Sequence, residues 1–90
     1  MVEVFLVEDW AINGFYLAIA PISTYIKEGD LVLMEGEGQG FRRASCDSIP
    51  LDENGADFKM LKMLAKDNVL KAIGKYRLKE FDWEEGKEDE

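Results

Sequence analysis

Apolar residues near the start of the chain fall in short runs bounded by turn-forming residues. The run Val2–Val7 is rich in β-branched and aromatic side chains, which favours a strand. Asn13-Gly14 is a dipeptide preferred in the type I′ turns of hairpins. Residues 15–20 then form a second strand, which Pro21 ends because proline donates no hydrogen bond to a ladder. The pattern predicts a β-hairpin.

The middle of the chain predicts two more strands joined by a glycine-rich turn. A Gly29-Asp30 turn leads into a strand over residues 31–35, and three of the next five residues are glycines, which permit a tight connection. Residues 41–49 return as a strand that Pro50 closes. Alternation places Arg42, Ala44, Cys46 and Ser48 on one face of this strand and Phe41, Arg43, Ser45, Asp47 and Ile49 on the other.

Beyond a turn cluster at residues 52–55, the apolar period changes from two to that of a helix. We expect one helix of about three turns, with Asn54 or Asp57 as its N-cap and a stop at residues 67–68. Packing against the core explains its apolar stripe, whereas a partly exposed methionine-rich face would indicate a dimer or a partner contact. The stripe consists of Phe58, Leu61, Leu64 and Ala65, widened by Met60 and Met63, and Lys59, Lys62 and Lys66 lie outside it.

From Leu70 the period returns to two, which predicts a last strand with one basic face. The element order β-β-β-β-α-β predicts an α+β, mainly β fold: a small curled antiparallel sheet or an open SH3-like barrel with one helix. The segment Ile26–Leu33, a Gly-Asp turn before an apolar strand, resembles the entry strand of SH3-like and related small barrels. Residues 1–83 are expected to form a single globular domain, and residues 84–90 an acidic, frayed tail.

The net charge of −8 is unevenly distributed along the chain. Residues 1–41 hold seven acids and one base, residues 42–79 nine bases and five acids, and residues 80–90 seven acids and one base. The basic middle supplies the candidate interaction surface, whose members are Arg42, Arg43, Lys71, Lys75, Arg77 and Lys79. Nucleic-acid binding through residues 42–79 is the alternative function, but an acidic protein repels nucleic acid, and solvated lysines paired with acids explain the same pattern.

The composition argues against most catalytic and metal chemistry. The chain has no histidine and a single cysteine, Cys46, so it lacks the usual ligands of zinc and the usual base for a nucleophile. We expect no cofactor, no metal and no catalytic residue. The alternating pattern around Cys46 predicts a small half-buried side chain.

The segment from Ile22 to Leu33 resembles the region around the nucleophile of LexA-type and signal-peptidase-type Ser–Lys proteases, where a serine precedes a Gly-Asp turn and an apolar strand. The resemblance implies a remote alternative, a Ser–Lys hydrolase-like barrel. The sequence departs from that pattern: Thr24 replaces the methionine after the serine, and the spacing to Gly29 is shorter. The lysines at a suitable distance, Lys59 and Lys62, fall on the polar side of the predicted helix rather than desolvated on a strand.

These patterns favour a small non-enzymatic interaction or regulatory domain of the kind that phages and mobile elements encode, acting by contact with a protein partner. Its most specific form is charge-mediated contact of the acidic termini with a basic protein. No apolar run is long enough to cross a bilayer, so we expect a cytoplasmic protein without membrane contact. A homodimer paired through an edge strand such as Val2–Val7 is a further expectation.

Overall fold

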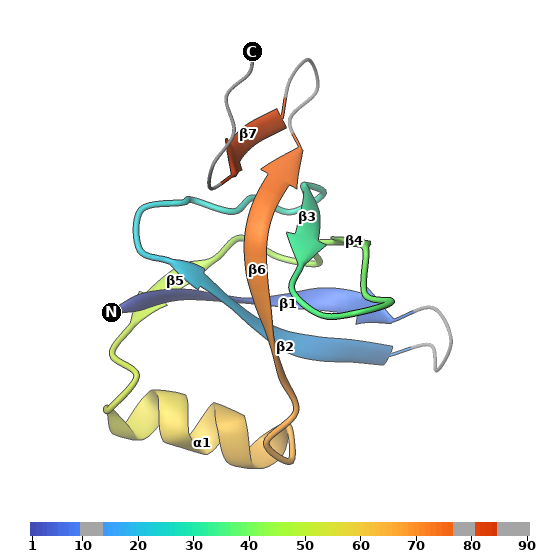
Figure 1. The fold of residues 1–90 in the computed structure, drawn as a ribbon. Helices are drawn as coiled ribbons and strands as arrows, with labels where there is room; N and C mark the ends of the chain where they lie inside the picture. Colours follow the sequence, from blue (N-terminus) through green and yellow to red (C-terminus); the bar gives the residue numbers. More distant parts are fainter. Residues whose placement is uncertain (10–13, 77–80, 85–90) are drawn as a thin grey trace.

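The computed structural model describes residues 1–9, 14–76 and 81–84, the last four by their backbone alone. Its elements run in the order β1 (Val2–Asp9), β2 (Gly14–Pro21), β3 (Leu31–Met34), β4 (Phe41–Arg43), β5 (Ile49–Leu51), α1 (Ala56–Leu64), β6 (Val69–Tyr76) and β7 (Phe81–Glu84) (Figure 1). The fold is mainly β with one helix, which confirms the predicted class. Of the predicted turn and tail, Asn13 and residues 85–90 lie outside the described residues.

The strands form one open sheet in the order β4-β3-β6-β2-β1-β5, with β7 also paired to β6. The sheet is mixed rather than antiparallel as predicted, because residues 17–19 of β2 pair in parallel with residues 69–71 of β6. A bridge between Val7 and Ala44 brings the end of β4 back to β1, and the Ser45 amide donates to the Leu6 carbonyl at 2.8 Å. The sheet therefore curls on itself without closing.

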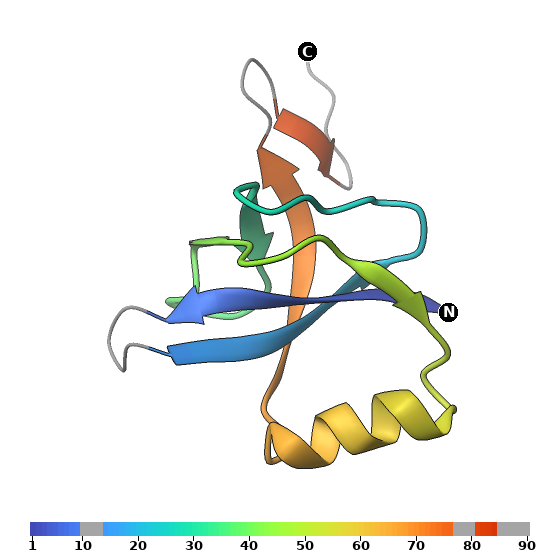
Figure 2. The same ribbon diagram turned by 180° about the vertical axis from the view of Figure 1, so that it is seen from behind.

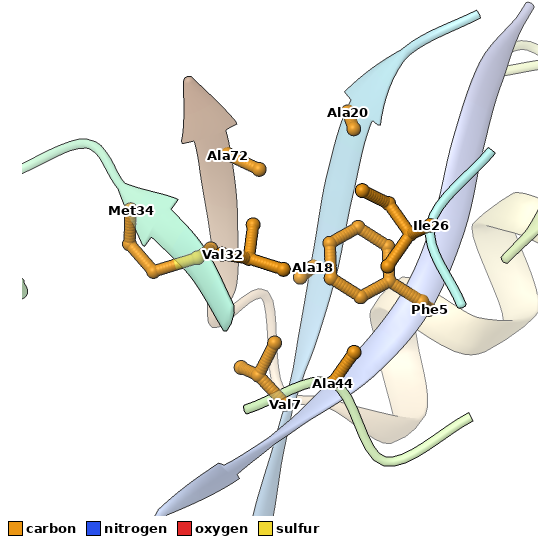
Figure 3. Close-up of a cluster of buried hydrophobic side chains, with 9 residues drawn as sticks. All are labelled: Phe5, Val7, Ala18, Ala20, Ile26, Val32, Met34, Ala44 and Ala72. Carbon is orange, nitrogen blue, oxygen red and sulfur yellow. The ribbon is translucent and has the colours of Figure 1, made fainter. Parts of the chain in front are cut away.

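The main core fills the inside of this curl. Because side chains alternate along β1, Phe5 and Val7 point inward, where they meet Ala18 of β2 and Val32 of β3. Figure 3 shows the ring of Phe5 beside the side chains of Ala18 and Ile26. Four of the nine buried members of this core are alanines, so it is filled largely by small side chains: Phe5, Val7, Ala18, Ala20, Ile26, Val32, Met34, Ala44 and Ala72.

The helix packs on the other side of the β1–β2 hairpin, away from β3 and β7 (Figures 1 and 2). Phe58 of α1 contacts Val4 and Leu17, the alternate residues of the two strands. Gly55 occupies the N-cap position and makes no side-chain hydrogen bond, so the expected cap at Asn54 or Asp57 is wrong. The helix ends at Leu64, and the left-handed backbone of Lys66 and Asp67 stops it, near the predicted position.

Three expectations about strands need correction. Residues 41–49 do not form one strand; β4 ends at Arg43 and β5 begins at Ile49. Pro50 lies within β5 instead of closing a strand, which is possible because β5 is at the edge of the sheet. The run Val2–Val7 is not an edge, since β1 is paired on both sides, with β2 and with β5.

Candidate functional site

Among the described residues of β6 the predicted basic face is interrupted, because Lys75 points inward and is only 1% exposed. The cause is an irregularity in the pairing of β6 with β3, where Gly74 pairs with Leu33 but Ala72 pairs with Met34. The extra residue, Ile73, is a β-bulge that shifts the alternation by one position. As a result Lys75, and not Gly74, follows Ala72 as the next inward-facing side chain.

Lys75 holds the connection between β2 and β3, residues 22–30, from inside the curl. Its ammonium group donates hydrogen bonds to the backbone carbonyls of Thr24 and Tyr25, at 3.1 Å for Tyr25. Charged donors on carbonyl acceptors form stronger hydrogen bonds than neutral donors do. The lysine that the sequence assigned to an outer surface therefore anchors a loop.

Glu3 anchors the same connection from β1. This carboxylate is 3% exposed. It accepts a hydrogen bond from the Ser23 amide at 3.0 Å and one from the Ser48 hydroxyl at 2.7 Å. The Ser48 oxygen in turn accepts the Ile26 amide at 3.1 Å. We expected the acids near the N-terminus to contact a basic partner, but Glu3 is buried and hydrogen-bonded within the fold.

These contacts impose an unusual backbone on the connection. Ser23 and Tyr25 have φ values of 73° and 51°, in the left-handed region that residues other than glycine rarely adopt. Such conformations persist where surrounding contacts over-determine them. The hydrogen bonds from Lys75 and to Glu3 supply that constraint.

Lys75 also bears on the Ser–Lys alternative, because it is a desolvated lysine on a strand, close to Ser23 in space. The hydrogen bonds described for its nitrogen go to carbonyls, which suit an ammonium donor and not a base. Ser23 is exposed and uses its amide, not its hydroxyl, to contact Glu3. Lys59 lies on the exposed side of α1, as predicted. The described contacts assemble no nucleophile–base pair here.

Arg42, a second member of the predicted surface, is also directed inward. Its guanidinium lies 3.9 Å from the Asp9 carboxylate, donates to the Glu8 carbonyl at 3.1 Å, and stands over the ring of Tyr16 at 5.0 Å from its centre. Gln39 accepts two further hydrogen bonds from it. The alternation of residues 41–49 was consistent with this inward direction, since it places Arg42 on the same face as Ala44, which is buried.

The Asp9–Tyr16 contact makes a pH-dependent prediction. A hydrogen bond to Asp9, and the charge of this carboxylate, raise the pKa of Tyr16 above its ordinary value. The neutral phenol is favoured in the folded state, so its contribution to stability is complete below the unfolded pKa of about 10 and is lost as the pH rises through the folded value. Asp9→Asn is expected to lower the pKa of Tyr16, measured by NMR titration of its ring, whereas Asp57→Asn on α1 leaves it unchanged. An unaltered Tyr16 titration in Asp9→Asn would contradict this.

The remaining members of the predicted surface do not form a patch among the described residues. Arg43 and Lys71 are exposed, but Arg43 is level with Tyr76 across β3, five residues along β6 from Lys71. This corresponds to a separation of about 16 Å along the strand alone. Arg77 and Lys79 lie outside the described residues.

In the part of the chain that the structure describes, the lining of two surface pockets holds no catalytic constellation. One of about 550 Å³ is lined by Glu8, Glu28 and Arg43 beside Phe15, a mixture of charges around one ring. Ser45, whose buried hydroxyl has no hydrogen-bond partner in the part of the chain described, lies in its wall. Within the described ranges no three His, Cys, Asp or Glu side chains are placed to hold a metal ion. Cys46 is half-buried against the core, as predicted.

The outer side of α1 is the most exposed apolar feature of the described surface. Met60, Met63 and Leu64 are 59%, 71% and 73% exposed. Leu64 is not buried as predicted, because at about 100° per residue it lies some 120° around the helix from Phe58, the buried residue of α1. Their i, i+3, i+4 spacing makes one continuous stripe, which we call the α1 stripe. In both ribbon views the side of α1 away from the sheet is not covered by another labelled element (Figures 1 and 2).

Within the described residues, no helix has the length and apolar character needed to cross a membrane. The chain matches no protein-family model, and comparisons with curated proteins and with solved structures found no significant similarity.

Proposed function

We propose that this protein is a non-enzymatic interaction domain that binds a protein partner through the α1 stripe. The observation that carries the proposal is the exposure of Met60, Met63 and Leu64 on one side of one helix. Contiguous exposed apolar patches on small domains are often functional contacts. Methionine side chains are flexible and polarisable, so they adapt to a partner's surface.

The composition of the core supports the same proposal. Alanines fill four positions of the main core, while three large side chains remain on the helix surface. Burying a large apolar side chain stabilises a domain by about 1.5–3 kcal/mol. A chain that leaves three such residues outside forgoes this stabilisation, which a bound partner restores.

The test compares variants of the complete chain in affinity capture from cells that contain its natural partners. The double variant Met60→Ser/Met63→Ser is expected to capture at least about tenfold less of the partner than the parent does. The matched control is Ile22→Ser, which removes another exposed apolar side chain outside α1. The free energy of unfolding of both variants is expected to stay within about 0.5 kcal/mol of the parent's.

Two results would count against the proposal. One is capture of the same proteins in the same amounts by the parent and by the double variant. The other is binding of oligonucleotides by the parent at low salt, weakened as salt rises, which would favour the nucleic-acid alternative. The inward positions of Arg42 and Lys75 make the second result unexpected.

A further inference from the structure

We infer that the partner of the α1 stripe presents an acidic amphipathic helix, an inference that rests on the proposed function. Three lysines, Lys59, Lys62 and Lys66, follow one another at spacings of three and four along and just beyond the helix, and all three are exposed. No ion pair described for this chain includes them. In a protein with 19 acids and 11 bases, residues 56–67 hold these three lysines against two acids, Asp57 and Asp67, which is a local reversal of charge.

The geometry of the helix places this row beside the α1 stripe. At about 100° per residue, Met60 lies nearly opposite Phe58 and Met63 nearly opposite Leu61, whereas Leu64 lies about 60° from Leu61 at the edge of the α1 stripe. The same rotation puts Lys59 and Lys62 together on one flank, between the stripe and the sheet, and Asp57 on the other flank. Lys66 follows just after the end of the helix, where the backbone is left-handed. A partner on this face therefore meets an apolar ridge with ammonium groups along one side.

An amphipathic helix with an acidic row fits both parts of this surface. Helical partners use apolar anchors at i, i+3, i+4 and i+7, and the α1 stripe offers such anchors an apolar ridge of just over one turn. Glutamates three or four positions apart on the same helix face pair with lysines of like spacing. A second copy of the chain fits less well, because an antiparallel two-fold packing of α1 on itself brings both lysine rows to the same side.

The experiment uses three synthetic helical peptides and the full chain, with binding measured by fluorescence anisotropy. The first peptide carries a leucine seam beside a glutamate row, the second the same seam beside a lysine row, and the third a serine seam beside the glutamate row. The parent is expected to bind the first at least about tenfold more tightly than either other peptide, and less tightly as salt rises.

Charge reversal separates this inference from a general apolar contact. Lys59→Glu is expected to weaken binding of the glutamate peptide about tenfold and to strengthen that of the lysine peptide. Glutamate in the first half of a helix suits its dipole, so the variant keeps its fold. Lys71→Glu, an exposed lysine of β6, is the matched control and is expected to leave both affinities unchanged.

The outcomes separate the two claims. Equal affinity for the glutamate and lysine peptides, or no effect of Lys59→Glu, overturns the inference while the proposed function stands if Met60→Ser/Met63→Ser still loses its captured partner. Binding to phosphatidylserine vesicles in preference to the peptides also overturns it, in favour of a membrane surface. Self-association abolished by Met63→Ser would assign the stripe to a second copy and overturn it as well.

Discussion

Replacing Lys75 by methionine is expected to lower the free energy of unfolding by about 3 kcal/mol. Methionine has a similar length, so it fills most of the same space. It cannot donate a hydrogen bond, and the carbonyls of Thr24 and Tyr25 lose their charged donor. The left-handed backbone of Tyr25 then also loses one of the contacts that hold it.

Urea denaturation followed by circular dichroism measures this effect. Lys71→Met on the same strand is the matched control, and because Lys71 is exposed the change is expected to stay within about 0.5 kcal/mol. Equal or greater stability of Lys75→Met would contradict the prediction. It would show that the cost of taking the ammonium group out of water equals what its hydrogen bonds return.

Replacing Glu3 by leucine is expected to cost a similar amount, about 3 kcal/mol. The change leaves the Ser23 amide and the Ser48 hydroxyl without the carboxylate that accepts both. Glu3→Gln keeps one acceptor oxygen, so its expected loss is smaller, about 1 kcal/mol. Hydrogen exchange should report the same event locally, with faster exchange of the Ser23 and Ile26 amides.

The test depends on the order of the two variants in free energy of unfolding, with Glu3→Leu expected to be less stable than Glu3→Gln. Glu35→Gln, at an exposed position after β3, controls for loss of a carboxylate from an acidic protein, which by itself reduces charge repulsion. If Glu3→Leu were no less stable than Glu3→Gln, the hydrogen bonds of Glu3 would not be what holds residues 22–30.

The sequence was sufficient for the parts of the fold that follow from local periodicity. The β-branched and aromatic side chains of Val2–Val7 predicted the first strand, and the change of period near Phe58 predicted the helix. The alternation even contained the inward direction of Arg42, which shares a face with Ala44. The same rule puts Glu3 on the inner face with Phe5, so its burial was readable as well.

What the sequence could not supply depends on pairing between distant segments. The bulge at Ile73, which turns Lys75 inward, exists only in the register that β6 adopts against β3. Pro50 stops a strand by local rules, and only the edge position of β5 makes it acceptable. The sequence left two interpretations of Met60 and Met63, packing against the core or a partly exposed face. Only the way the helix packs on the hairpin decided between them.

The parallel pairing of β2 with β6 also determines when the sheet can be completed during synthesis of the chain. Leu17 pairs with Val69, roughly fifty residues later. During synthesis the hairpin leaves the ribosome well before the strand that completes the sheet. Until then one edge of β2 is unpaired, so the nascent chain spends seconds in a state open to wrong partners. This state ends when β6 pairs with β2. The same strand brings Lys75 to residues 22–30, where it donates a hydrogen bond to the Tyr25 carbonyl.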